Sequence, residues 1–577
     1  MKMKTKNILI VIVFFVSVTH IKAQLKINKK SIGVYTKIAP EKIYINQNTD
    51  VLFSGEKLFF KLFCLNNDFS AGISKIVYVE LIDFNRNTVF KQKIRLKDAV
   101  AYGDFKAPYN LSSGNYKLIA YTQWMRNGGN QNYSSSDVYL VNPFSNEQSN
   151  FIKVNKPYNK PVIKETNNDL LELVLNQKVY SKREKVSLSI NTIKNDLSFG
   201  NYSVSVKRKE QLSSQTINNK VFKKPILNNS YNFKNVNNEY YWVYPPEHNG
   251  ELITGKVLNI KNNKPVKDIR VALSIPSETF VFNIVKTNKL GEFFFDLEKN
   301  YLGNNAIIQI EDSRKEKYKI TINPPASFDY SNLKFGKVQL SENDLITIKR
   351  ISKNTQIENA YIEVKQDSII TILPEVTFYK PDYTYVLDDF KRFPSVKETM
   401  VEIVEHSWVT TKKENTYFSV RDYKSKGKED ASPLILIDGI LIQNHNDLND
   451  YDVKNIHAIN IITDKFLFHK KTYGGVISVF TKDLNFTPIT KGAFLKNLNL
   501  NKPVLDKIYF KQEYLENNKR VPDFRSQLLW QPKLVLNSTK KELSFYTSDN
   551  TGEYEIIVEG YTFKGEKVKV KQLFKVL

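Results

Sequence analysis

Strand-like alternation of apolar and polar residues runs through most of the 577-residue chain and restricts it to a mainly β fold. In KIVYVELIDF, the apolar residues Val77, Val79 and Leu81 recur with a period of two, which is typical of a half-buried strand. VSLSINTI and GNYSVSVKRK continue the pattern, and we expect them to pair around a turn at 194–196. Because a single core stops growing near ~250–300 residues, the sequence predicts several β domains.

One helix is predicted, directly after Ser395. Ser395 and Glu398, three residues apart, form the signature of a capping box. Apolar residues then follow at helical spacing, namely Val396, Met400, Ile403 and Val404. The other segments give no comparable helical pattern.

The N-terminus has the residue order of a secretory signal. Three lysines lie in residues 1–6, an apolar run covers residues 8–18, and Ala23 precedes Gln24. This order predicts a signal peptide over residues 1–23, with cleavage between Ala23 and Gln24. An uncleaved anchor helix is the alternative, but a run of about a dozen apolar residues is short for a bilayer span. We therefore expect the chain to be exported.

The single cysteine, Cys64, excludes an intramolecular disulfide, so stability must come from packing. We expect Cys64 to be a small buried residue in its apolar segment, with a reactive nucleophile as the alternative. The formal net charge of +25 favours anionic partners such as lipid headgroups, acidic glycans or acidic proteins, or reflects a lysine-rich composition alone. No nucleic-acid-binding motif occurs, and we expect no nucleic-acid partner.

Residue types that carry catalysis or bind metals do not occur in recognisable spacings. The histidines lack the H-x-x-x-H and H-E-x-x-H patterns, and no Gly-x-Ser-x-Gly elbow or Walker loop is present. A metal site built by His445, His457 and His469 is the alternative to packed or solvated side chains. The acidic stretch 446–452 lacks the glycine and distal glutamate of a calcium loop, so we expect a helix to start there. We expect no enzymatic activity, no cofactor and no metal.

The stretch from Glu41 to Asn127 resembles a macroglobulin-type β-sandwich domain in the version found in Gram-negative envelopes. The matching residues are Gly55, Glu80, Gly103, Phe105, Gly114, Tyr116, Tyr121 and Trp124. NQKVYSKREKVSLSI resembles the start of a second such domain, and the segment that begins VPDFRSQLLW resembles a third. The resemblance implies sandwiches over residues 30–145, 165–245 and 500–577. A covalent protease trap is not implied, because Cys64 lacks the Gly-Glu-Gln neighbours of that family's thioester.

Residues 250–325 resemble the carboxypeptidase regulatory-like fold. The resemblance is carried by ITGKVLNIKNNKPVKDIRVALSI and VKTNKLGEFFFDL, with the signature residues Gly255, Val257, Pro265, Val266, Thr287, Gly291, Phe293 and Phe295. That fold is a small β-sandwich that serves as a structural module. It implies no peptidase chemistry.

The stretch from Ser432 to Lys482 resembles the plug domain of TonB-dependent outer-membrane receptors. LILIDGILI is typical of two strands joined by a hairpin turn at Asp438 and Gly439. NDYDVKNIHAINII follows the plug pattern of a short helix leading into a strand, and YGGVISVFTK matches its closing strand. The resemblance implies a small α+β domain over residues 370–485. Its candidate docking motif consists of Asp438, Gly439, Tyr473, Gly474 and Gly475.

Receptors of that family enclose the plug in a barrel of about 22 strands formed by the same chain. At ~9–11 residues per strand, such a barrel needs roughly 200 residues, more than follow Lys482 in this sequence. We therefore expect the barrel to belong to another protein.

The domain order resembles a family of Gram-negative envelope proteins that combine macroglobulin-like, regulatory-like and plug-like domains without a barrel. It implies a non-enzymatic protein in the periplasm or at the periplasmic face of the outer membrane, with peripheral membrane contact. Its expected partner is another macromolecule, in the first place an outer-membrane β-barrel protein. One alternative is a plug or gate of a separate outer-membrane translocon. Another is a periplasmic glycan- or peptide-binding protein.

Overall fold

The structure is a computed structural model and confirms the mainly β fold. It describes residues 25–129, 131–144, 151–153, 168–210, 230–236, 239–323, 328–336, 338–340, 344–370, 379–421, 431–488, 490–516 and 519–577. The predicted signal peptide and its cleavage residues Ala23 and Gln24 lie outside these ranges. Within them, no helix is both long and apolar enough to cross a membrane.

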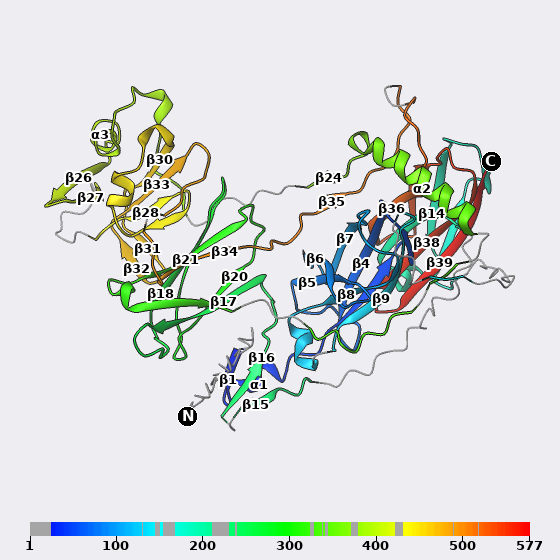
Figure 1. The fold of residues 1–577 in the computed structure, drawn as a ribbon, viewed down its shortest axis with the longest axis horizontal. Helices are drawn as coiled ribbons and strands as arrows, with labels where there is room; N and C mark the ends of the chain where they lie inside the picture. The colour runs from blue at the N-terminus through cyan, green and yellow to red at the C-terminus, as the bar shows by residue number, and fades with distance from the viewer. Residues whose placement is uncertain are drawn as a thin grey trace, which may run out of the picture.

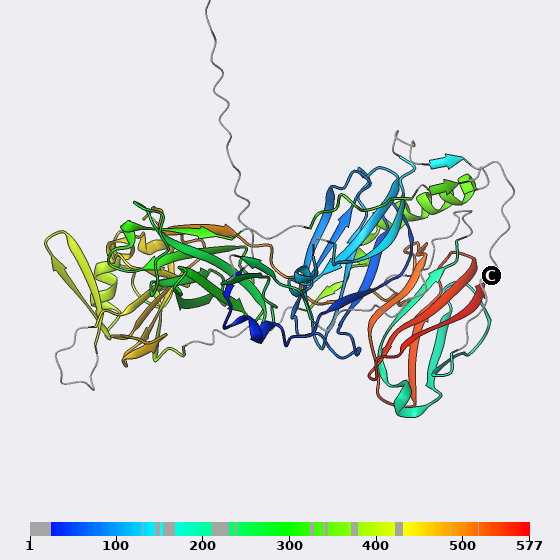
Figure 2. The ribbon, with the colours of Figure 1, turned by 90° about the horizontal axis from the view of Figure 1, so that it is seen from below.

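Four domains follow one another in an elongated row (Figures 1 and 2). An α+β domain lies at one end and contacts a sandwich that we call the third sandwich. The first sandwich follows, and the second sandwich forms the other end (Figure 2). The chain does not visit these domains in spatial order, because the second sandwich contains both early and late strands (Figure 1).

The first sandwich packs a three-stranded sheet against a five-stranded sheet. The first sheet is formed by β2 (Lys42–Gln47), β4 (Lys57–Leu65) and β7 (Val100–Lys106), and the second by β3 (Val51–Phe53), β9 (Ser134–Val141), β8 (Gly114–Tyr121), β5 (Ile76–Ile82) and β6 (Thr88–Arg95). The predicted half-buried strand is β5, which is in fact buried on both faces. Tyr330 from a later segment covers its second face and donates a hydrogen bond to Glu80 at 3.1 Å. Cys64 is fully buried in β4, as predicted.

The second sandwich combines strands from two segments that lie far apart in the sequence. One sheet contains β11 (Leu171–Leu175), β13 (Lys185–Thr192) and β37 (Lys540–Tyr546), and the other β12 (Val179–Tyr180), β39 (Lys567–Val576), β38 (Gly552–Thr562), β14 (Gly200–Arg208) and β36 (Gln527–Leu536). Their side chains share one core. The prediction of separate sandwiches over residues 165–245 and 500–577 is therefore wrong. Both sheets contain strands of both segments, so neither segment completes a sandwich by itself.

The predicted pairing of VSLSINTI with GNYSVSVKRK is also wrong. The first stretch forms β13, which pairs with β11 and β37. The second forms β14, which pairs with β36 and β38 in the facing sheet. The short 3-10 helix η2 (Asn195–Ser198) between them carries the chain from one sheet to the other.

The third sandwich corresponds to the segment expected as a regulatory-like fold. Its sheets are β20 (Glu292–Leu297), β17 (Glu251–Asn259) and β22 (Tyr318–Ile322) in one layer, and β19 (Val281–Lys286), β18 (Arg270–Ile275), β21 (Asn305–Glu311) and β34 (Leu495–Asn499) in the other. β34 comes from a segment beyond the predicted range 250–325 and extends the second sheet. The Thr287 hydroxyl donates to the Val266 carbonyl and accepts from the Ile269 amide. It thus links the end of β19 to the segment before β18.

The α+β domain is built on a five-stranded sheet flanked by two short helices. In order, its strands are β25 (Tyr383–Val386), β30 (Ile456–Ile462), β33 (Val476–Thr481), β28 (Leu434–Ile437) and β29 (Ile440–Ile442). The helices are α3 (Val396–Glu402) and α4 (Asn446–Asn449), and the hairpins β26 (Ser407–Lys412) with β27 (Asn415–Val420) and β31 (Phe466–Phe468) with β32 (Lys471–Tyr473). The predicted helix is confirmed as α3, since the Ser395 side chain accepts a hydrogen bond from the Glu398 amide. The helix start expected in 446–452 is confirmed as α4.

A 17-residue helix that the sequence did not predict, α2 (Asp344–Ala360), lies beside the first and second sandwiches (Figure 1). Asn359 donates to the Gly55 carbonyl of the first sandwich at 3.2 Å, and Asn354 to Asn550 of the second at 2.7 Å. The helix therefore bridges the two sandwiches. The remaining elements are α1 (Ile32–Tyr35), β1 (Leu25–Asn28) with β16 (Tyr240–Val243) and β15 (Lys234–Val236), β10 (Phe151–Lys153) with β23 (Val338–Leu340), and β24 (Ser368–Ile369) with β35 (Lys507–Ile508).

Candidate functional site

The predicted docking motif is brought together in space, but it faces another domain of the same chain. Asp438 and Gly439 form the expected hairpin turn, with φ values of 51° and 82°. Both values are positive, as a type I′ turn requires. The Asp438 carboxylate is fully buried and accepts from the amide and hydroxyl of Thr481, each at 2.7 Å. Asp438 therefore holds two strands of its own domain together.

Gly439 packs directly on the third sandwich. A Cβ atom at Gly439 would lie 2.3 Å from the ring of Phe280. Tyr473 is buried at the same contact, where its hydroxyl donates to Glu311 at 2.8 Å and accepts from Arg270 at 3.1 Å. The two domains share one apolar cluster there, which includes Ala272, Phe282, Ile284, Leu434, Leu436, Leu441, Ile462 and Val476.

The two remaining motif glycines are close-approach positions inside the α+β domain. A Cβ at Gly474 would lie 2.0 Å from the Ala431 carbonyl oxygen, and one at Gly475 would lie 2.5 Å from that of Ile462. Gly475 also has a φ of +100°, which favours glycine. These residues thus shape the domain and its contact with the third sandwich.

The opposite edge of the α+β sheet is free in the part of the chain that the structure describes. β25 pairs with β30 on one side and with no described strand on the other. On this edge Tyr383 is 44% exposed and stacks on His406, with ring centroids 3.6 Å apart. The neighbouring hairpin exposes Trp408 and Tyr417 as well.

The three histidines considered as metal ligands, His445, His457 and His469, have different surroundings. The His445 ring accepts a hydrogen bond from the Phe418 amide at 2.9 Å, and His469 lies in the β31–β32 turn. His457 is exposed on β30. Across the described ranges, no group of three or more His, Cys, Asp or Glu side chains is arranged to hold a metal ion. Burial raises the pKa of the Cys64 thiol well above its ordinary value, and Glu41 adds to this.

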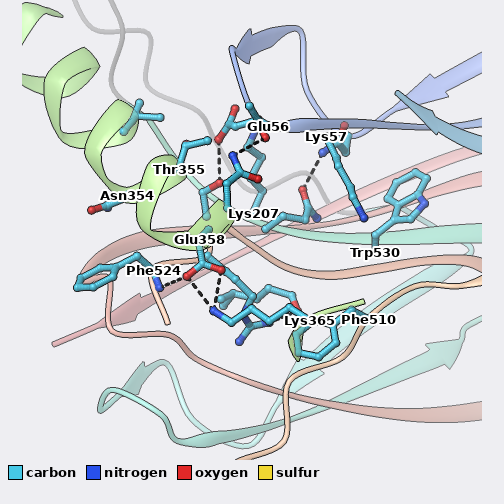
Figure 3. A pocket seen from close by; sticks show the side chains of 18 of the residues that line it. Glu56, Lys57, Lys207, Asn354, Thr355, Glu358, Lys365, Phe510, Phe524 and Trp530 are labelled. Atoms are coloured by element: carbon cyan, nitrogen blue, oxygen red, sulfur yellow. Dashed lines mark hydrogen bonds and ion pairs between the residues drawn. The ribbon is translucent and has the colours of Figure 1, made fainter. Parts of the chain in front are cut away.

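A cavity of about 170 Å³ lies where the first sandwich, helix α2 and the second sandwich meet (Figure 3). It is lined by side chains from the β3–β4 turn and β4, the ends of β7 and β14, α2 with the segment after it, the segment after β35, and the segment that leads into β36 with β36 itself, together with Asn48 and Asn550. Sequence reasoning missed this site. Its residues come from positions as distant as Lys57 and Trp530, and no local motif connects them.

One wall of the cavity is a network of buried charges. Lys365 donates to both oxygens of Glu358, at 2.9 and 2.8 Å, and to the Pro522 carbonyl at 2.9 Å. Glu358 in turn accepts from the Phe524 amide (Figure 3). Burial raises the pKa of Glu358, and Lys365 opposes that shift. The network fixes the end of α2 to the second sandwich.

A second charged pair lies behind this wall. Arg525 donates two hydrogen bonds of 2.7 Å to the two oxygens of Asp523. Burial opposes ionisation of Asp523, but Arg525, Tyr514 and Lys365 together outweigh it, and the pKa of Asp523 is lowered. Two parallel bonds of this kind are stronger than single neutral ones. This side of the cavity therefore carries an ionised, hydrogen-bonded pair.

The facing wall is aromatic. Trp530 stacks on Phe59 with ring centroids 5.7 Å apart, and Tyr509 meets Phe59 edge-on at 5.1 Å. Trp530 is 4% exposed, and its indole Nε1 is buried with no hydrogen-bond partner among the described residues. This wall of the cavity is therefore apolar and aromatic.

No protein-family model matches the sequence, and no curated protein matches it. Bacterial α2-macroglobulins are similar in structure. The match with the Salmonella protein reacted with methylamine covers 93% of this chain and 40% of the Salmonella chain, at 9% identity and a TM-score of 0.23. The native Escherichia coli protein matches 94% and 40%, at 10% identity and a TM-score of 0.23. The Escherichia coli adhesin FdeC matches 35% of this chain and 54% of its own, at 9% identity and a TM-score of 0.14.

This chain therefore spans 40% of the length of the two α2-macroglobulins.

Proposed function

We propose that this chain is a non-enzymatic, exported protein of a Gram-negative envelope that binds another protein through the free edge of its α+β domain. The observation that supports this is the sheet order β25-β30-β33-β28-β29. The β29 edge is covered, since Gln309 of the third sandwich donates to the Leu441 carbonyl at 2.9 Å. Among the described strands, only β30 pairs with β25, so the outer edge of β25 presents N–H and C=O groups that a strand of a partner can pair.

The partner that we propose is an outer-membrane β-barrel protein, reached from the periplasmic side with peripheral membrane contact. The plug-like pattern of residues 432–482 motivates this choice. The docking surface is then the β25 edge with Tyr383 and the hairpin that carries Trp408. The motif around Asp438 and Gly439 has a supporting role, since it holds the domain on the third sandwich.

The buried contact with the third sandwich argues against a gate that enters a barrel. To act as a plug, the α+β domain would have to expose the apolar cluster around Phe280 and Leu436 to water. Exposure of apolar surface costs about 25 cal/mol per Å². A glycan-binding role is less well supported, because the cavity of about 170 Å³ is small against the ~300–1,000 Å³ of ordinary ligand pockets.

The test is co-purification of a barrel protein from cross-linked envelopes with a tagged chain. We expect the double variant Tyr383→Lys and Trp408→Lys to lose most of the captured barrel, because charged side chains on an edge oppose strand addition. The matched control is Phe563→Lys, which charges an aromatic residue that is 64% exposed in the second sandwich. Undiminished capture by the double variant, with unchanged thermal unfolding, would remove the β25 edge from the proposal.

A further inference from the structure

One end of the third sandwich is formed by three neighbouring segments of the chain. They are residues 260–268 between β17 and β18, residues 286–292 from the end of β19 to the start of β20, and residues 312–319 from the end of β21 into β22. The Ile260 amide donates to the Lys317 carbonyl at 2.9 Å, and the Asp268 amide to the Thr287 carbonyl at 2.9 Å. The three segments therefore lie side by side, and we call the surface that they form the basic end.

Positive charge is in excess at the basic end. Its segments contain nine lysines and arginines against four acidic residues. Three of the acids pair with cations: Asp268 with Lys267, Glu292 with Lys256 and Asp312 with Arg314. The fourth acid, Glu316, interacts with its neighbour Lys315. Six lysines form no ion pair with any described residue, and all but the last of them are exposed: Lys261, Lys264, Lys286, Lys289, Lys317 and Lys319.

The opposite end of the same sandwich has no such excess. Its loops, residues 276–280 and 298–304, contain the acids Glu278 and Glu298 and a single lysine, Lys299. That end contacts the first sandwich, where Arg95 donates to the Leu297 carbonyl at 2.9 Å. A lysine-rich composition alone would not place the excess at one end. The basic end points away from the first sandwich.

Ile260 adds an apolar side chain to these lysines. It is 43% exposed and directly precedes Lys261. The stems of the lysines are apolar as well, and they can lie on an apolar surface while their ammonium groups stay in water. An anionic lipid bilayer matches both features, because its negative headgroups cover an apolar layer. A soluble acidic polysaccharide offers the charge without the apolar layer.

We propose that the basic end binds the surface of an anionic phospholipid bilayer. The lysine ammonium groups lie among the lipid phosphates, and Ile260 enters the boundary between headgroups and acyl chains. Several weak attractions add up in such a contact, and salt screens each of them. The proposal deepens the peripheral membrane contact of the proposed function and rests on it for the compartment. Its test needs no barrel protein, so it holds or fails separately from the β25 edge.

The test is co-sedimentation of the chain from Gln24 onward with lipid vesicles at low ionic strength. One set of vesicles contains phosphatidylcholine and phosphatidylglycerol in equal parts, and the other contains phosphatidylcholine alone. We expect at least tenfold tighter binding to the anionic vesicles, and its loss at about 1 M salt, where the Debye length is ~3 Å. Equal binding to both sets overturns the proposal. Binding to soluble dextran sulfate without binding to the anionic vesicles overturns it in favour of an acidic polysaccharide.

A triple variant locates the contact. We expect Lys261→Gln, Lys264→Gln and Lys289→Gln together to weaken binding to the anionic vesicles at least tenfold, because three exposed charges are lost. The matched control removes the same charge from exposed positions of the second sandwich, with Lys178→Gln, Lys182→Gln and Lys185→Gln. Equal affinities of the two triple variants overturn the assignment, since binding would then follow net charge alone.

A single variant tests the apolar part of the contact. Ile260→Ser keeps every lysine and removes the apolar side chain, and we expect it to weaken binding to the anionic vesicles several fold. Unchanged binding of a variant that is folded by circular dichroism overturns the insertion of Ile260.

Discussion

Glu247 is the carboxyl group most strongly perturbed at the contact between the first and third sandwiches. It is 2% exposed and accepts hydrogen bonds from the Tyr78 hydroxyl at 3.0 Å and the Leu252 amide at 3.1 Å. Burial raises the pKa of Glu247 from 4.5 to about 8, against the opposing effects of the Leu252 amide and of Lys93. At neutral pH this buried side chain is a neutral acid.

The stability of this contact should fall as the pH rises from 4.5 to about 8. In that window the unfolded chain releases the proton of Glu247 and the folded chain keeps it. The free energy of unfolding therefore falls by at most about 1.4 kcal/mol per pH unit. Below 4.5 both states are protonated and the full stability is present. We expect Glu247→Gln to remove this dependence.

The measurement is the midpoint of thermal unfolding at several pH values across the window. Glu414→Gln, at an exposed position, serves as the control and should keep the pH dependence of the unaltered chain. A Glu247→Gln protein with the same pH dependence as the control would contradict the assignment.

At single residues, the sequence predicted local geometry well. The Asp438-Gly439 turn and the Ser395 cap both form, because turn and capping preferences act within a few residues. What covers those residues is not a local property. Nothing near Gly439 in the sequence indicates that Phe280, some 160 residues earlier, lies against it.

Helix α2 was not predicted from the sequence. Its buried residues are Asp344, Ile348, Ile351 and Thr355, while Leu345 and Ile346 are 52% and 78% exposed. Apolar side chains on both sides of the helix obscure the period of 3.6 residues on which prediction depends. The cavity remained hidden with it, since α2 forms one of its walls.

The contact between the α+β domain and the third sandwich is a testable property of the β28–β29 hairpin. A Cβ at Gly439 would meet the Phe280 ring at 2.3 Å. Because the ring or the hairpin must shift to admit it, we expect Gly439→Ala to destabilise the α+β domain by on the order of 1–3 kcal/mol.

Hydrogen exchange of the amides in β28 and β29 measures this loss of stability. The additional change Phe280→Ala should relieve part of the loss caused by Gly439→Ala, because it removes the clashing ring. Purely additive effects of the two changes would show that the two residues do not press on each other.

At the scale of the whole molecule, the second sandwich is completed only by the last part of the chain. Residues 168–210 provide β11 to β14, and β36 to β39 come from residues 527–576. The sequence showed strands in both places, but pairing across more than 300 residues leaves no mark on either one. This is why two sandwiches were predicted where one exists.

We expect a chain truncated after residue 520 to leave residues 168–210 unfolded, because β14 loses both of its neighbours, β36 and β38. Limited proteolysis with mass spectrometry should then find new cleavage within 168–210, while the third sandwich and the α+β domain stay protected. Addition of a separate peptide of residues 521–577 should restore protection. Continued protection of 168–210 without that peptide would contradict the shared core.

The chain leaves the second sandwich and returns to it at the same place, since Lys207 near the end of β14 pairs with Gln527 at the start of β36. A pull on the α+β domain relative to the second sandwich therefore draws the ends of both strands in the same direction. Among the described strands, β36 pairs with β14 alone, and β14 pairs also with β38. Such a pull acts along β14 and β36 together, and the hydrogen bonds between β14 and β38 resist it together in shear. The second sandwich is thus attached to the rest of the molecule in the direction in which a sheet resists force best.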